Sequence, residues 1–95
     1  MIIVSQDEDL ILNFKNIDAI GTGNPLDNDN GMFKVLASTT SDNEYTLGYY
    51  KTEERAKEIL QEIIKKYRDV TVVCDINNNK YEKYDLPKVF EMPKE

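Results

Sequence analysis

The sequence predicts an α+β domain in which a mainly antiparallel sheet of five to seven short strands packs one face against a single amphipathic helix over residues 52–68. Short β-branched and aromatic runs alternate with turn residues along most of the chain. One stretch carries apolar residues at helical spacing. The chain has 95 residues, of which 40% are hydrophobic and 32% charged, so we expect a single domain, 1–95, with a modest core.

The N-terminal half predicts five strands, at Ile2–Gln6, Leu10–Lys15, Ile17–Thr22, Met32–Thr40 and Tyr45–Tyr50. In the second of these, Leu10, Leu12 and Phe14 share a face and Ile11 is the exception. The polar run 23–31 predicts a loop, and the short polar run 41–44 predicts the turn of a hairpin. In the strand before that turn, Phe33, Val35 and Ala37 share a face.

The helix has a clear beginning and a clear apolar face. Thr52 is the expected N-cap, and Glu53 and Glu54 suit the positive end of the helix dipole, although Arg55 stands where a capping box needs Glu or Gln. The last turn is basic, as the negative end of the dipole favours. The apolar stripe consists of Ala56, Ile59, Leu60, Ile63, Ile64 and Tyr67. We expect Ile59, Leu60, Ile63 and Ile64 to centre the core against Phe33, Val35 and Leu47.

The C-terminal part predicts a second hairpin and a last strand. Val70–Ile76 alternates, with Val70, Val72, Cys74 and Ile76 on one face. Asn77–Asn79 predicts a tight turn, and the charged run Lys80–Tyr84 predicts the returning arm. Val89–Met92, between two prolines, is typical of an edge strand.

Four segments together resemble a family of small uncharacterised proteins of Firmicutes, especially clostridia, and of their phages and prophages. The segments are Val4–Gln6, Asn13–Phe14, Leu47–Leu60 and Val89–Pro93. They cover about half of the chain, and the stretches 23–31 and 70–87 depart from the pattern. The resemblance implies a one-domain protein and a phage or prophage origin, but it implies no activity.

Composition excludes several classes of function. The 18 Asp and Glu against 12 Lys and Arg give a net charge of −6, so we expect no direct nucleic-acid binding, which depends on clustered basic residues. The chain has no His, the commonest acid–base group near neutral pH, and its single cysteine allows no internal disulfide. Without a secretory leader pattern or a membrane-length apolar run, the sequence predicts a soluble cytoplasmic protein with no membrane contact.

No motif predicts a catalytic residue, a metal or a cofactor. In the loop Asp27–Gly31, the glycine and the closing carboxylate of a calcium loop are misplaced. Gly21–Gly23 lacks the remainder of a phosphate-binding loop. Cys74 lies among apolar residues with no basic neighbour, as expected of a buried thiol. The acidic triplet Asp7–Asp9 suits a solvated turn better than a pair of catalytic carboxylates.

The six tyrosines indicate where a partner could bind. Simple alternation places Tyr45 and Tyr49 on one side of their strand and Tyr50 on the other. Tyr50, Tyr81 and Tyr84 are therefore candidates for surface aromatics in a partner-binding site. Equally, amphipathic tyrosines can lie partly covered at the margin of the core.

Two functions of different classes follow. One helix leaves part of the sheet uncovered, which favours a non-enzymatic module that binds a protein partner or forms a homodimer through that face or an edge strand. The alternative is an acidic inhibitor that mimics nucleic-acid charge against a host or defence enzyme. It requires the acidic turn residues to converge, namely Asp7, Glu8, Asp9, Asp27, Asp29, Asp42 and Glu44. A small enzyme is the least favoured class.

Overall fold

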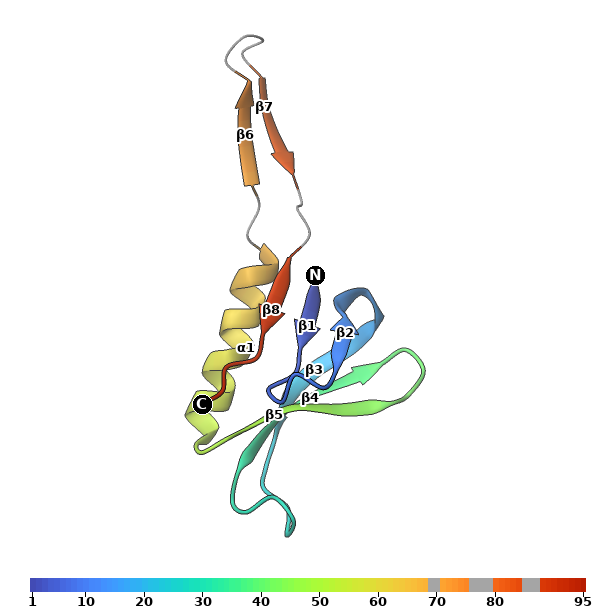
Figure 1. Cartoon of the computed structure of the whole chain (residues 1–95), viewed down its shortest axis with the longest axis vertical. Helices are drawn as coiled ribbons and strands as arrows, with labels where there is room; N and C mark the ends of the chain where they lie inside the picture. The colour runs from blue at the N-terminus through green and yellow to red at the C-terminus, as the bar shows by residue number, and fades with distance from the viewer. Residues whose placement is uncertain (69–70, 76–79, 85–87) are drawn as a thin grey trace.

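The computed structural model describes residues 1–68, 71–75, 80–84 and 88–95, and its description of side chains covers 1–68 and 88–95. The class is α+β, as predicted: one helix and antiparallel-rich sheets. The expected single sheet of five to seven strands is wrong for these residues. The strands divide into two three-stranded sheets and a separate hairpin (Figure 1).

The central sheet contains β3 (Ile17–Gly23), β4 (Phe33–Thr39) and β5 (Glu44–Tyr50), antiparallel and in that order. All three coincide with predicted strands, and the hairpin β4–β5 has the predicted turn. Val35 and Ala37 are buried and Phe33 is partly buried, which confirms the predicted inward face of β4.

The terminal sheet joins the two ends of the chain. It contains β2 (Ile11–Asn13), β1 (Ile2–Val4) and β8 (Val89–Glu91), in that order, and a 3-10 turn, η1 (Phe14–Asn16), follows β2. β1 pairs antiparallel with β2 and parallel with β8. A parallel pair needs a long connection between its strands, and here that connection includes the helix. β8 lies at the edge of the sheet, as its flanking prolines predicted.

The helix α1 (Glu53–Arg68) begins as the sequence predicted, because the Arg55 backbone N–H donates to Thr52 Oγ1 at 3.1 Å. Its buried residues are Ala56, Ile59 and Ile63. Leu60 is partly buried, whereas Ile64 and Tyr67 are 39% and 56% exposed, so the expectation that Ile64 centres the core is wrong. The apolar stripe is wider than the face that the sheets cover.

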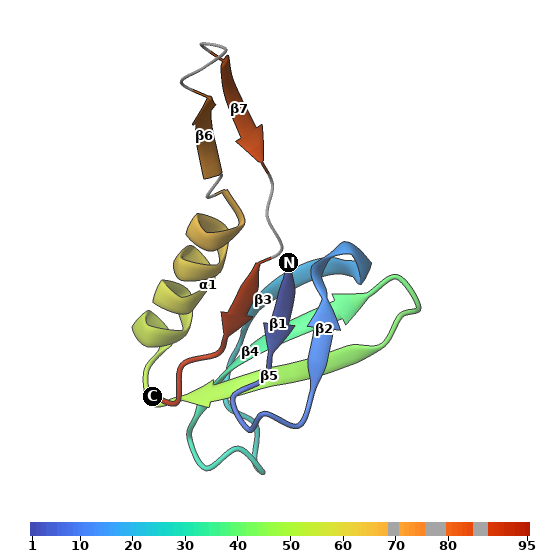
Figure 2. The same ribbon diagram turned by 45° about the horizontal axis from the view of Figure 1, so that its top comes forward.

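The core lies where the inner faces of the two sheets meet the helix (Figure 2). Its largest fully buried side chains are Tyr50, Ile3, Leu47, Ile59, Ile63 and Val35. Leu12 and Met92 close it from the terminal sheet and the segment after β8. The inner face of the central sheet is thus covered by α1 and by the terminal sheet together.

The second hairpin consists of β6 (Thr71–Asp75) and β7 (Lys80–Tyr84), paired antiparallel from Thr71↔Tyr84 to Asp75↔Lys80. It extends away from the two sheets along the longest axis, which measures 61 Å (Figure 1). Both arms confirm predicted strands. The predicted Asn77–Asn79 turn lies outside the described residues, as do the side chains predicted to share a face of β6.

A β-bulge in β5 determines which side chains enter the core. The register passes from Leu36↔Thr46 to Val35↔Gly48, so Leu47 is an extra residue with no partner on β4. The extra residue reverses the alternation, and Leu47 and Tyr50 both point inward, each 1% exposed. Tyr49 points outward and is 37% exposed. The predicted arrangement, with Tyr49 beside Tyr45 and Tyr50 opposite, is therefore wrong.

The Tyr50 ring lies directly over Gly48, where a side chain would not fit. A Cβ at position 48 would lie 2.7 Å from Tyr50 Oη and 2.9 Å from Tyr50 Cε2. The ring therefore packs directly on the glycine backbone, an arrangement seen where an aromatic residue covers a strand glycine.

The first prediction concerns the helix face. Ile63→Ala removes a fully buried side chain and should lower the free energy of unfolding by roughly 2–5 kcal/mol. Ile64→Ala, the same change one residue on at a 39% exposed position, should cost much less. Thermal melts of the two variants compare them directly. Equal melting temperatures would contradict the observed orientation of the helix.

The second prediction concerns Gly48. Gly48→Ala should destabilise the protein by about 1–3 kcal/mol, because the new methyl group overlaps the Tyr50 ring. Gly21→Ala is the matched control in β3, where a Cβ meets nothing within 4 Å, and should change stability by less than about 0.5 kcal/mol. Urea titrations measure both. A Gly48→Ala protein as stable as the Gly21→Ala protein would show that Tyr50 does not occupy this position.

Candidate interaction surface

The outer face of the terminal sheet carries four aliphatic side chains: Ile2, Val4, Ile11 and Val89. Register places Ile2 beside Val89 and Val4 beside Ile11, on the face opposite the buried Ile3 and Leu12. Ile11 is 62% exposed and Val89 is 50% exposed, and Ile2 and Val4 are partly exposed. Asn13 and Glu91 complete the face at opposite corners. We call these four aliphatic residues the terminal-sheet patch.

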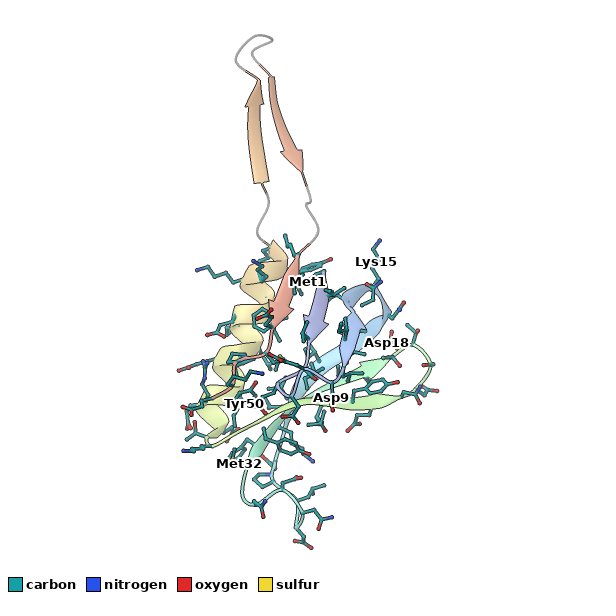
Figure 3. The ribbon with its side chains drawn as sticks, in the orientation of Figure 1. Met1, Asp9, Lys15, Asp18, Met32 and Tyr50 are labelled. Carbon is teal, nitrogen blue, oxygen red and sulfur yellow. The ribbon has the colours of Figure 1, made fainter. Side chains whose placement is uncertain are left out.

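The two ends of the terminal sheet carry opposite charge. The turn between β1 and β2 supplies Asp7, Glu8 and Asp9, and Glu91 stands level with Val4 near the same end. Lys94 lies against this end, with its Nζ 3.1 Å from Glu8 Oε1. Figure 3 shows Asp9 at this end and Met1 and Lys15 at the other.

The end opposite the acidic turn is mainly basic, although Asp18 lies near Lys15 there (Figure 3). Lys15 lies in η1, and Lys88, which immediately precedes β8, donates from Nζ to Tyr67 O at 2.9 Å. Lys65, Lys66 and Arg68 in the last turn of α1 belong to the same end of the molecule (Figure 1). The terminal-sheet patch therefore lies between an acidic end and a basic end.

The three tyrosines predicted for a partner-binding site have different outcomes. Tyr50 is not a surface aromatic: it is 1% exposed, and its hydroxyl donates to Pro93 O at 2.8 Å. The bulge in β5 is the reason, because it turns Tyr50 into the core. The side chains of Tyr81 and Tyr84 lie outside those that the structure describes, so their proposed role stays a prediction.

Gln6 ties the terminal sheet to β5 through its side chain and its backbone. Its Oε1 accepts from Tyr49 N at 2.8 Å, and its Nε2 donates to Tyr49 O and Lys94 O, both at 2.9 Å. Its backbone N–H donates to Leu47 O at 2.7 Å, on the bulge itself. The amide therefore behaves like one residue of a neighbouring strand along the edge of β5.

A cavity of about 420 Å³ opens beside this amide, at the junction of β5 and α1. Met32, Tyr49 and Tyr50 line it, together with three basic residues, Lys51, Arg55 and Lys94, and one acidic residue, Glu95. Figure 3 shows Met32 and Tyr50 near the first turn of α1. The cavity joins residues from four separate parts of the sequence, so no local motif could indicate it.

The acidic turns do not converge. Asp27 and Asp29 precede β4, whereas Asp42 and Glu44 follow it, so these pairs lie at opposite ends of a strand about 23 Å long. The Asp29 carboxylate accepts from Leu26 N at 2.8 Å and lies 3.1 Å from Lys34 Nζ. That hydrogen bond and the ammonium hold the pKa of Asp29 below its ordinary value. Asp29 thus organises its own loop.

The remaining sequence candidates concern metal ions, Cys74 and the membrane. Within the described ranges, no group of three or more His, Cys, Asp or Glu is arranged to hold a metal ion. Cys74 belongs to β6, and its side chain lies outside the described part. In the same part of the chain, no helix is long and apolar enough to cross a membrane.

Comparison with known proteins finds no matching family model, curated protein or solved structure. The resemblance to small clostridial and phage proteins therefore stays a prediction.

Sequence reasoning missed the terminal-sheet patch, although one signal for it was present. Ile11 broke the alternation of the second predicted strand, and an isoleucine on the polar side of a strand marks an exposed apolar position. Ile2, Val4 and Val89 join it only through the pairing of the two chain ends, which no local pattern reports.

The third prediction concerns Tyr50 and pH. Burial raises the pKa of Tyr50 from 10.0 to about 12. As pH rises above 10, the unfolded chain therefore releases this proton before the folded protein does, and stability should fall progressively between about pH 10 and 12. Tyr50→Phe should lose about 1 kcal/mol with the Pro93 hydrogen bond, and should show a shallower decline over that range. Thermal melts at successive pH values measure both effects; identical slopes for the two proteins would contradict the prediction.

Proposed function

We propose that this protein is a non-enzymatic, self-associating module that pairs through the terminal-sheet patch with a second copy of itself. The observation that carries the proposal is the exposed aliphatic cluster of Ile2, Val4, Ile11 and Val89 on the outer face of the terminal sheet. Aliphatic side chains that line up across three strands in this way favour burial against another surface.

The charges around the patch favour a second copy as the occupant. In a two-fold face-to-face pairing with antiparallel strands, the acidic end of each terminal sheet meets the basic end of its partner. In this arrangement, β8 of one copy lies across β8 of the other. Glu91, at the end of one β8, then lies near Lys88, which precedes the partner's β8. A parallel pairing would bring like charges together, and it is the less favourable arrangement.

The acidic-inhibitor alternative has weaker support. Mimicry of a phosphate backbone needs carboxylates gathered on one surface, whereas the acidic turns stand at opposite ends of β4 and Asp29 and Glu8 each pair with a lysine. The phage or prophage origin rests on the resemblance alone and stays part of the proposal.

The fourth prediction tests the patch by analytical ultracentrifugation over a concentration series. The parent protein should show a monomer–dimer equilibrium. Ile11→Lys should raise the dimer Kd at least about tenfold, because it removes apolar contact and places a cation opposite the partner's basic end. Val89→Lys should act in the same direction but more weakly, because it loses apolar contact while its cation faces the partner's acidic end. Leu26→Lys is the control, since Leu26 is 67% exposed but lies in the loop before β4.

Two results would overturn the proposal. One is a parent protein that stays monomeric at the highest concentration reached. The other is a dimer that Leu26→Lys weakens as much as Ile11→Lys does, because association would then not depend on the terminal sheet.

A further inference from the structure

We propose that the cavity between β5 and α1 binds a small aromatic molecule that carries one anionic group. This inference does not depend on self-association. It rests on the shape of the cavity, on the apolar side chains that line it and on the charges at its rim.

The size and walls of the cavity suit a flat ring. Its volume of about 420 Å³ falls within the range of small-ligand sites. The thioether of Met32 and the ring of Tyr49, which is 37% exposed, present apolar and aromatic surface to it, and sulfur and aromatic side chains both pack well against rings. Tyr50 adds a wall whose hydroxyl is already committed to Pro93 O.

The rim determines the charge of the ligand. Arg55 Nη1 lies 3.2 Å from Glu58 Oε2 and 3.3 Å from Glu62 Oε1, and Lys94 Nζ contacts Gln6 O and Glu8, so these two cations are largely offset. Lys51 is exposed and forms no hydrogen bond or ion pair within the part of the chain that is described. Its ammonium is therefore the cation available to an anion. Glu95 is the acidic residue of the lining, and its backbone oxygen accepts from Arg55 Nε at 3.0 Å.

The walls are held in place before any ligand enters. The Gln6 amide fixes Tyr49 and Lys94 relative to each other, Tyr50 Oη holds Pro93, and Arg55 Nε donates to Glu95 O at 3.0 Å. Binding therefore requires little ordering of these elements, which favours affinity for a small ligand.

The fifth prediction uses three probes that separate the ring from the charge. Indole-3-acetate carries both, indole-3-acetamide carries the ring alone, and acetate carries the charge alone. In a two-dimensional amide NMR titration, indole-3-acetate should shift the signals of Tyr49–Thr52, Arg55 and the Gln6 side chain, with a Kd on the order of 1 mM. The other two probes should bind at least about fivefold more weakly.

Two variants and a control locate the site. Lys51→Gln should weaken indole-3-acetate about three- to fivefold and leave indole-3-acetamide unchanged, because it removes only the cation. Tyr49→Ala should weaken both aromatic probes. Lys65→Gln removes an exposed cation from the last turn of α1 and should change neither.

The inference is overturned if the signals that shift lie away from these residues, or if no shift occurs up to about 10 mM probe. It is also overturned if indole-3-acetamide binds the parent protein as tightly as indole-3-acetate, or if Lys65→Gln and Lys51→Gln have the same effect.

Discussion

The extra residue at Leu47 is the constraint on which the rest of the structure depends. Because the bulge reverses the alternation of β5, Leu47 and Tyr50 both enter the core and Gly48 leaves room for the tyrosine ring. Leu47 O then accepts from Gln6 N, and Tyr50 Oη donates to Pro93 O. One irregular position in the middle of the chain thus connects β5 both to the start of the chain and to its C-terminal segment.

This connection explains why the strands form two sheets. The segment around Gln6 meets β5 through a side-chain amide and a single backbone hydrogen bond, so β1 does not continue the central sheet as a fourth strand. β1 pairs with β2 and β8 instead, and their inner face packs over the core beside α1. Its outer face consequently has nothing to cover it within the described residues, and aliphatic side chains at Ile11 and Val89 remain in contact with solvent.

The sequence was sufficient for local structure and insufficient for pairing between distant segments. Thr52 and the apolar spacing after it gave the helix with its correct start, and alternation gave β4 with its inward face, because both depend on neighbouring residues. The bulge at Leu47 has no such local signal, so alternation alone predicts the wrong side of the strand for Tyr50. The parallel pairing of β1 with β8 spans nearly the whole chain, and both the aliphatic patch and the cavity at Gln6 are consequences of such long-range contacts.

The net charge of −6 opposes any pairing of two copies, and its effect depends on distance. At physiological ionic strength, charges separated by more than about 8 Å are largely screened from each other, so most acidic residues of one copy have little influence on the other. The charges that matter are those at the two ends of the short terminal sheet, where three-residue strands span only about 10 Å. There the acidic β1–β2 turn and the basic end near Lys15 are opposite in sign. A chain that is acidic as a whole can therefore present to its own copy a surface that is locally complementary, provided that the strands of the two copies run antiparallel.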